Sequence, residues 1–180
     1  MAAISTALLT VEEFLALPEV EGMRRELLHG EMLEMPCAGQ RHEVVKLEFN
    51  KALVRYTMRH PVGEVLSETS YRMSTDKLLT PDVSLMFPER LKKIGSGHFR
   101  GAPELAVEVV SSESARTLQR KVDVYLSNGG LLVWAAYGDE RLVIAHDRTG
   151  ITRFRQDQRL EAPELLPGFS VPVSQFFVRL

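Results

Sequence analysis

One acidic residue inside an apolar run is the strongest chemical signal in this sequence. Residues 105–110 read Leu-Ala-Val-Glu-Val-Val, and Glu108 is the only charged residue among them. Burying an ionised carboxylate costs several kcal/mol unless a partner compensates it. A bound cation is one such partner, and the alternatives are an arginine or a strand end that reaches water. Glu108 is therefore a candidate metal ligand.

Two further residues could complete a metal site with Glu108. Asp82 follows Pro81 at the start of another apolar segment, and two carboxylates on neighbouring strands can hold Mg²⁺ while leaving positions for water and phosphate oxygens. Lys121 follows on a predicted helix, where its stem could cross the buried stripe and its amine could orient a water or stabilise phosphoryl charge. Taken singly, Asp82 could equally be a turn residue and Lys121 a solvated lysine.

A strand, a helix and a second strand must position Glu108 and Lys121. Residues 104–110 form a nearly continuous apolar strand, and residues 114–128 carry apolar residues at helical spacing until Gly129 and Gly130 stop the helix. Residues 131–136 return as a strand. This order predicts a βαβ crossover, and ligand sites favour the strand ends of such units.

The first third of the chain predicts a helix, a hairpin and a long helix. Thr10-Val-Glu-Glu13 is a capping-box pattern that opens a short helix. Strands at residues 24–28 and 31–35 flank His29-Gly30, which is typical of a tight hairpin turn. Apolar residues then recur at helical spacing from Arg41 to His60.

The remaining segments complete the prediction of one domain over residues 1–180. The further strand-like segments are residues 64–68, 71–74, 83–87, 141–146, 151–154 and a short piece near Arg159. Residues 88–101 are predicted to form a polar loop, and residues 173–177 a brief C-terminal helix or tail. We therefore expect an α/β (α+β) fold with a mixed central β-sheet flanked by helices, an N-terminal helix-hairpin and a C-terminal strand meander.

Composition narrows the class of protein. The 180 residues are 44% hydrophobic and 26% charged, which is ordinary for a globular domain. An uncharged apolar run of about 18 residues would be needed for a membrane span, and the sequence has none. Residues 1–9 lack the basic region of a secretory leader, so a cytoplasmic location is expected. The single cysteine, Cys37, cannot form an internal disulfide, and it has no second thiol or histidine pair for structural zinc.

Charge neither requires nor excludes binding to nucleic acid. The formal net charge is −2, whereas proteins that grip a phosphate backbone usually carry a basic surplus. Basic residues do gather locally between Arg90 and Arg100, and again between Arg116 and Lys121. Solvated surface and contact with nucleic acid both remain open for these two stretches.

Pro81-Asp82, Glu108-Val109-Val110 and Lys121 together resemble the catalytic motif of the PD-(D/E)XK nuclease superfamily. The superfamily usually carries its lysine two residues after the acid, on the same strand face about 6.5 Å away. This chain has Val110 there. In some branches the lysine lies instead on the following helix, as Lys121 does.

A longer series of motifs resembles the Uma2 family, whose members are often described as restriction endonucleases. The matching segments, in chain order, are Thr10–Phe14, Glu26–Glu31, His42, Pro81–Val83, Ala102–Ser111, Lys121–Tyr125, Trp134 with its preceding glycine, and Leu166–Phe169. The departures are His29 in place of aspartate, Ser112 in place of proline, and Ala136-Tyr137 in place of Val-Asp. None of these departures involves Asp82, Glu108 or Lys121.

The resemblance implies a divalent-metal-dependent endonuclease acting on DNA. Asp82, Glu108 and the carbonyl of Val109 would hold Mg²⁺ or Mn²⁺, Lys121 would orient the attacking water, and cleavage would leave a 5′-phosphate. No organic cofactor is implied. A homodimer is expected, because many restriction-type enzymes cut two strands with two copies. The alternative is a non-catalytic or weakly catalytic homodimer that binds nucleic acid or protein on the same fold.

Four other residues are weighed for a place near this site. Glu26 and His42 are possible supporting residues, since members of the superfamily often place an acid or polar side chain from the first helix or hairpin in the same cleft. Structural roles at the edge of the core are the alternative for both. Tyr125 and Trp134 are predicted as core aromatics, with stacking on a base as the less favoured reading.

Overall fold

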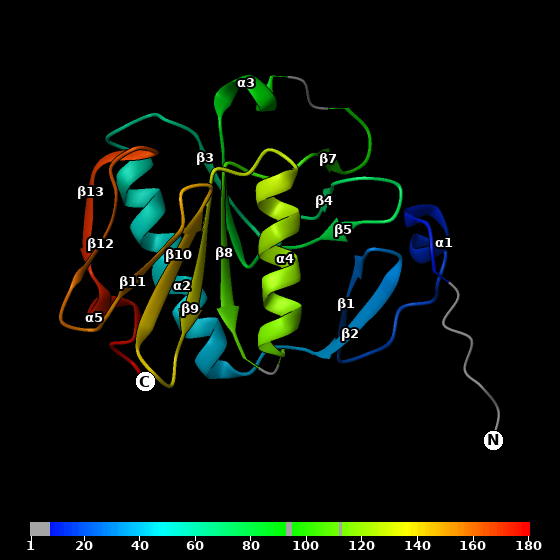
Figure 1. Cartoon of the computed structure of the whole chain (residues 1–180), viewed down its shortest axis with the longest axis horizontal. Coiled ribbons are helices and arrows are strands. Elements are labelled where there is room, and N and C mark those ends of the chain that lie inside the picture. The colour runs from blue at the N-terminus through cyan, green and yellow to red at the C-terminus, as the bar shows by residue number, and fades with distance from the viewer. Residues whose placement is uncertain (1–7, 93–94, 112) are drawn as a thin grey trace.

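The computed structural model describes residues 8–92, 95–111 and 113–180 (Figure 1). Its helices are α1 (Val11–Leu15), α2 (Gln40–Thr57), α3 (Pro88–Leu91), α4 (Ala115–Ser127) and α5 (Val173–Phe176). Its strands are β1 (Met23–Leu28), β2 (Glu31–Pro36), β3 (Glu64–Ser67), β4 (Tyr71–Arg72), β5 (Leu78–Leu79), β6 (Val83–Met86), β7 (Phe99–Arg100), β8 (Leu105–Val110), β9 (Leu132–Tyr137), β10 (Leu142–Asp147), β11 (Ile151–Phe154), β12 (Arg159–Ala162) and β13 (Leu166–Pro172).

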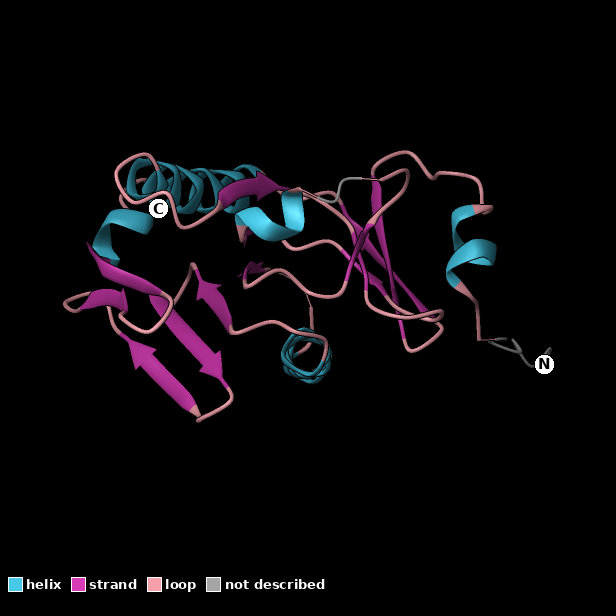
Figure 2. Cartoon of the chain, turned by 90° about the horizontal axis from the view of Figure 1, so that it is seen from above, coloured by secondary structure: helices cyan, strands magenta, loops and turns pink. Residues whose placement is uncertain are grey.

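A six-stranded mixed sheet forms the centre of the molecule. Its strand order is β11-β10-β9-β8-β6-β3, with β8 and β9 parallel and the other neighbours antiparallel. Helices α2 and α4 lie on opposite faces of this sheet (Figure 2). Because successive side chains of a strand point to opposite faces, Val107 and Val109 enter the core beneath α2 while Ala106 packs on the α4 side. Glu108 therefore faces α4.

Helix α4 also contacts a second, five-stranded sheet. That sheet has the order β2-β1-β5-β4-β7, and it includes the N-terminal hairpin. Leu28 of β1 and Leu79 of β5 share one apolar cluster with Val122 and Tyr125 of α4. Helix α1 closes the far side of the hairpin (Figure 1). The buried face of one helix thus packs against side chains from both sheets.

The sequence patterns explain why the main elements form where they do. Thr10 and Glu13 make the reciprocal hydrogen bonds of a capping box at the start of α1. At the hairpin turn, His29 and Gly30 adopt φ of 56° and 76°, as a primed two-residue turn requires. The hairpin, the long helix α2 and the β8-α4-β9 crossover are all confirmed.

The structure corrects two parts of the predicted fold. Residues 88–101 are not simply a loop, because they contain α3 and the two-residue strand β7. The C-terminal meander is also only partly right: β11 pairs with β10, whereas β12 pairs with the unpredicted strand β13 in a separate two-stranded sheet. Strands as short as β5 and β7 leave no alternation to read, and β5 depends on β1 as well as on the nearby β4, whereas β7 depends on β4.

Some predictions concern residues outside the described ranges. Residues 1–7, which make up most of the segment considered as a leader, lie outside them, as do Lys93 and Ser112. Within the part of the chain that is described, no helix has the length and apolar character needed to cross a lipid bilayer. That residues 1–180 form a single domain stays a prediction.

Candidate functional site

The five predicted site residues come from four elements and from the position just before β6, and they meet between the two sheets. Glu108 lies on β8, Lys121 on α4, Glu26 on β1 and His42 on α2, while Asp82 directly precedes β6. Each of them is buried, with exposed fractions from 2% for Asp82 and Glu26 to 8% for His42. These five residues, which are spread over nearly 100 positions of the chain, thus form one cluster of polar side chains within an otherwise apolar interior.

Lys121 connects two of the acids. Its Nζ donates to Glu108 Oε2 at 2.7 Å and lies 3.0 Å from Glu26 Oε2, a contact close enough for an ion pair but not aligned as a hydrogen bond. The other oxygen of Glu26 accepts the backbone N–H of Thr80 at 2.7 Å. The stem of Lys121 does cross the buried face of α4, so the lysine of the helix reaches the acid of the strand.

Asp82 is held by three donors from three segments. Oδ2 accepts the backbone N–H of Val109 at 2.8 Å and lies 3.2 Å from Nε2 of His42, whereas Oδ1 accepts Nη1 of Arg24 at 3.0 Å. Strands β6 and β8 are hydrogen-bonded neighbours, which explains how Asp82 reaches the backbone of Val109. Glu108 therefore lies on β8 and Asp82 lies immediately before the neighbouring strand β6, close to the predicted arrangement.

Three residues of this cluster were not predicted as site residues. Tyr125 is a fully buried core aromatic, as expected, but its hydroxyl also donates to Glu108 Oε1 at 2.6 Å. Arg24 binds Asp82, and Glu113 has a buried Oε2 with no hydrogen-bond partner among the described residues. Spacing could have indicated two of them, because Tyr125 is one helical turn after Lys121 and Arg24 shares a strand face with Glu26.

The cluster carries more negative than positive charge. Glu26, Asp82, Glu108 and Glu113 all act electrostatically on Lys121 or Glu108, and the permanent cations nearby are Lys121 and Arg24. Four carboxyl groups, if all ionised, therefore exceed these two cations. The excess is stored in a region that water scarcely reaches.

The pKa values of the acids depend first on burial and then on the neighbouring charges and hydrogen bonds. Burial raises the pKa of Glu108 to about 8, against the opposing effect of Lys121 and with help from Glu26 and Asp82. Burial also acts to raise the pKa of Asp82, but the hydrogen bonds from His42 and Val109 and the charge of Arg24 outweigh it and lower that pKa. Asp82 is therefore the more strongly acidic of the two candidate ligands.

The residues present fit a divalent cation in chemistry and charge. Carboxylate oxygens are the ligands that Mg²⁺ and Mn²⁺ prefer, and a divalent ion would balance the excess of negative charge. In the described part of the chain, no three His, Cys, Asp or Glu side chains stand ready as a metal cluster. Both oxygens of Asp82 and both of Glu108 are engaged by protein donors. A cation would therefore have to share or replace some of these donors.

A cavity of about 480 Å³ is lined by two of the residues that contact Asp82. Its lining includes Arg41, His42, Val109, Ser111 and Tyr137. His42 and Val109 are the residues that hold Oδ2 of Asp82, so this cavity shares two residues with the surroundings of the acid cluster. A larger cavity of about 720 Å³ lies between β10 and β11, but the acid cluster contributes nothing to its lining.

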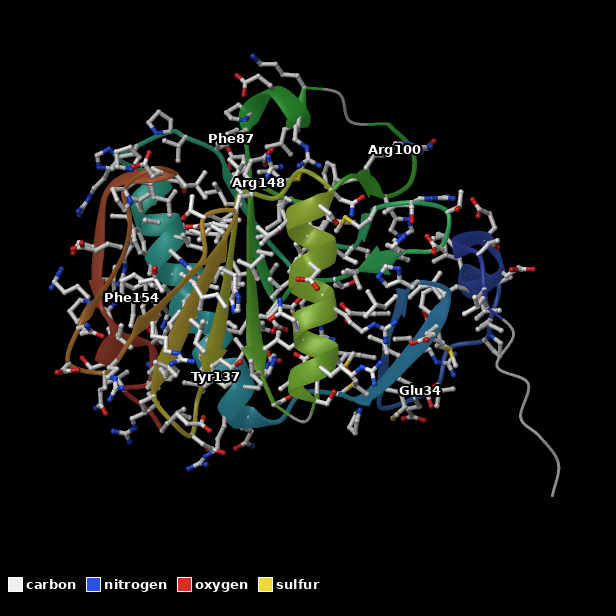
Figure 3. All side chains as sticks on the ribbon, viewed as in Figure 1. Glu34, Phe87, Arg100, Tyr137, Arg148 and Phe154 are labelled. Atoms are coloured by element: carbon white, nitrogen blue, oxygen red, sulfur yellow. The ribbon has the colours of Figure 1, made fainter. Side chains whose placement is uncertain are left out.

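One basic stretch lies away from this cavity. Tyr137, at the carboxyl end of β9, and Arg100 lie toward opposite ends of the molecule (Figure 3). Arg90 of the same stretch binds Glu104 and the carbonyls of Ala102 and Arg100, so it has a structural role. In the second stretch, Arg120 pairs with Glu31 at 2.8 Å and Lys121 is buried.

Comparisons with known proteins agree with this architecture. The model of the Uma2 family, described as "Putative restriction endonuclease", matches residues 11–174. A solved structure described as a "putative nuclease belonging to DUF820", from Anabaena variabilis, is similar with a TM-score of 0.83 and 20% identity, covering 94% of this chain and 98% of that one. No curated protein matches. The family match spans most of the sequence and includes every candidate site residue, so this chain belongs to the Uma2 family.

Proposed function

We propose that this protein is a divalent-metal-dependent endonuclease that hydrolyses phosphodiester bonds in DNA. The observation that carries the proposal is the position of Glu108, buried on β8 between Lys121 and Tyr125 and on the strand next to Asp82. A bound cation can compensate a buried cluster that has more carboxyl groups than basic groups, and acids beside a lysine are suited to phosphoryl chemistry. The family and the fold support nuclease function.

Asp82 and Glu108 would hold Mg²⁺ or Mn²⁺, with the carbonyl of Val109 as a third ligand. The backbone N–H of Val109 already points at Asp82, and the N–H and C=O of a strand residue face the same neighbouring strand. When bound, the cation would supply Lewis-acid activation of the phosphate and of the attacking water. The protein's own groups supply the remaining functions.

Lys121 is the residue that would orient the attacking water. The adjacent carboxylates of Glu108 and Glu26 raise its pKa against the opposing effect of burial, so its amine stays protonated. A buried ammonium can donate hydrogen bonds and stabilise negative charge on a phosphate. Glu26 keeps the amine in place from the β1 side, and His42 holds the carboxylate of Asp82 from α2.

Cleavage assays with matched variants test this proposal. Plasmid and linear DNA are incubated with Mg²⁺ or Mn²⁺, using wild type, Asp82→Ala, and Asp157→Asn as an exposed-acid control. We expect the wild type and the control to cut DNA. We expect no cutting in the presence of EDTA or by Asp82→Ala. Activity that survives both EDTA and Asp82→Ala would contradict the metal mechanism.

A second candidate function is a homodimer that binds nucleic acid or protein with little or no catalysis. It is favoured by the burial of the acids, since Asp82 and Glu108 are only 2% and 3% exposed, and by the net charge of −2. It predicts DNA affinity that is unchanged by Asp82→Ala and by divalent ions in a gel-shift series. Light scattering after size exclusion tests the homodimer in either case, and a monomer mass would contradict it.

A further inference from the structure

Arg24 lies at the boundary between the acid cluster and solvent. Its side chain is 26% exposed, whereas that of Asp82, which it contacts, is 3% exposed. Besides the 3.0 Å contact with Asp82 Oδ1, its Nη2 donates to the carbonyl of Thr80 at 3.3 Å. Arg24 and Glu26 are two residues apart on β1 and so point to the same face of the strand. The guanidinium therefore covers the acids from outside.

The contact with Arg24 is the replaceable one at Asp82. The other donors, the backbone N–H of Val109 and Nε2 of His42, both serve Oδ2 and come from a central strand and a buried helix face. Among the described residues, Arg24 is the only hydrogen-bond donor to Oδ1. A long side chain that is already partly exposed can leave without disturbing the core. A cation that binds Oδ1 would thus compete with Arg24.

Charge gives the exchange its direction. A divalent cation at Asp82 would replace a single positive charge with two and would repel the guanidinium at short range. Arg24 would then remain at the edge of the site, where two of its N–H groups could bind two oxygens of one phosphate. A phosphate group of the DNA substrate carries the negative charge that the released guanidinium of Arg24 could bind.

We propose that Arg24 exchanges ligands during the reaction cycle. It binds Asp82 when no divalent cation is bound, and it binds a backbone phosphate of the DNA substrate once the cation has taken Asp82. This inference rests on the proposed function, because it needs both the metal and the substrate. It assigns Arg24 two opposite effects: it weakens metal binding and strengthens DNA binding.

Two binding measurements separate these effects without relying on catalysis. Mn²⁺ binding is measured by titration calorimetry, and binding of a fluorescent DNA duplex is measured by anisotropy in Ca²⁺. For Arg24→Ala we expect Mn²⁺ affinity to rise and DNA affinity to fall, each on the order of ten-fold, as for one charged hydrogen bond. Arg24→Lys keeps the charge but loses the paired donors, so its Mn²⁺ affinity should stay near wild type while its DNA affinity falls in part.

Arg25→Ala is the matched control, because Arg25 is on the opposite face of β1 and pairs with Glu34 at 2.6 Å. It should leave both affinities unchanged. Urea denaturation of every variant checks that folding is retained. If Arg24→Ala weakens both Mn²⁺ and DNA binding, or changes neither, the exchange is wrong and Arg24 is a structural brace. If Asp82→Ala binds Mn²⁺ as wild type does, the metal site itself fails, which is a separate result.

Discussion

At the scale of single residues, the burial of the Glu108 carboxyl group depends on its two direct hydrogen-bond donors. One is charged and one is neutral: Lys121 donates to Oε2 and Tyr125 donates to Oε1. A carboxylate removed from water keeps its charge only while such donors remain, because the desolvation cost is otherwise several kcal/mol. Removing the charged donor and removing the neutral one should therefore have different, measurable costs.

Lys121→Met should destabilise the protein strongly. The methionine fills similar space but leaves the carboxyls of Glu108 and Glu26 without their shared cation, and breaking a buried pair in this way costs roughly 3–5 kcal/mol. The free energy of unfolding is measured by urea denaturation at pH 7. Lys92→Met, on an exposed residue, is the control and should stay within about 0.5 kcal/mol of wild type. Equal stability of the two variants would refute the ion pair.

Tyr125→Phe should cost about 1–3 kcal/mol, because it leaves the buried Oε1 of Glu108 without its donor. Tyr56→Phe provides a neutral comparison, since the Tyr56 hydroxyl donates at 2.9 Å to the carbonyl of Pro167. Its expected cost is about 0.5–1.5 kcal/mol. Denaturation curves of both variants decide the matter, and a smaller loss for Tyr125→Phe than for Tyr56→Phe would contradict the assigned contact.

At the scale of elements, α4 is the part that assembles the site. It packs against both sheets through one apolar cluster, and it presents Lys121 and Tyr125 to the same carboxylate. Its first turn depends on Ser114, whose hydroxyl accepts the backbone N–H of Thr117 at 3.1 Å. A weakened start of this helix should therefore affect stability before it affects the chemistry of the cluster.

Ser114→Ala should lower the free energy of unfolding by about 1 kcal/mol, since the N–H of Thr117 loses its capping acceptor. Ser114→Asp should retain most of that stability, because aspartate also accepts this hydrogen bond and suits the positive end of a helix. Thermal and urea denaturation of the two variants test the cap. Equal losses in both would show that the serine is needed for another reason.

At the scale of the whole molecule, stability should fall in mild acid because of His146. This residue is buried on β10, and burial lowers its pKa below the ordinary 6.5, with Asp123 opposing that effect. Below about pH 6.5 the imidazole of His146 is protonated in the unfolded chain but stays neutral in the folded chain. The stability present above that pH is therefore lost as the pH falls toward the folded-state pKa. Urea denaturation between pH 5 and 8 should show a shallower loss for His146→Gln than for wild type. Parallel curves for the two proteins would argue against a neutral buried histidine.

Local patterns in the sequence determined the elements and most of the site. The capping box, the helical spacing of α2 and α4, and the acid inside the apolar run of β8 are each contained within at most 18 consecutive residues. Periodicity over such short windows reflects which side of an element is buried. The residues themselves suggested Asp82 and Lys121 as partners of Glu108, the family resemblance supported both and added Glu26 and His42, and the structure brings the five together.

Only the tertiary structure decided which polar groups meet. Arg24 and Asp82 are 58 residues apart and Tyr125 and Glu108 are 17 apart, so their contacts depend on how the two sheets pack around α4. The two-residue strands β5 and β7 exist for the same reason, since each needs a partner from a distant segment. A sequence pattern predicts which face of a helix or strand is buried, but it does not say which distant segment covers that face. The choice among distant partners is made when the core closes, because that step alone sets which donor lies within reach of a buried carboxylate.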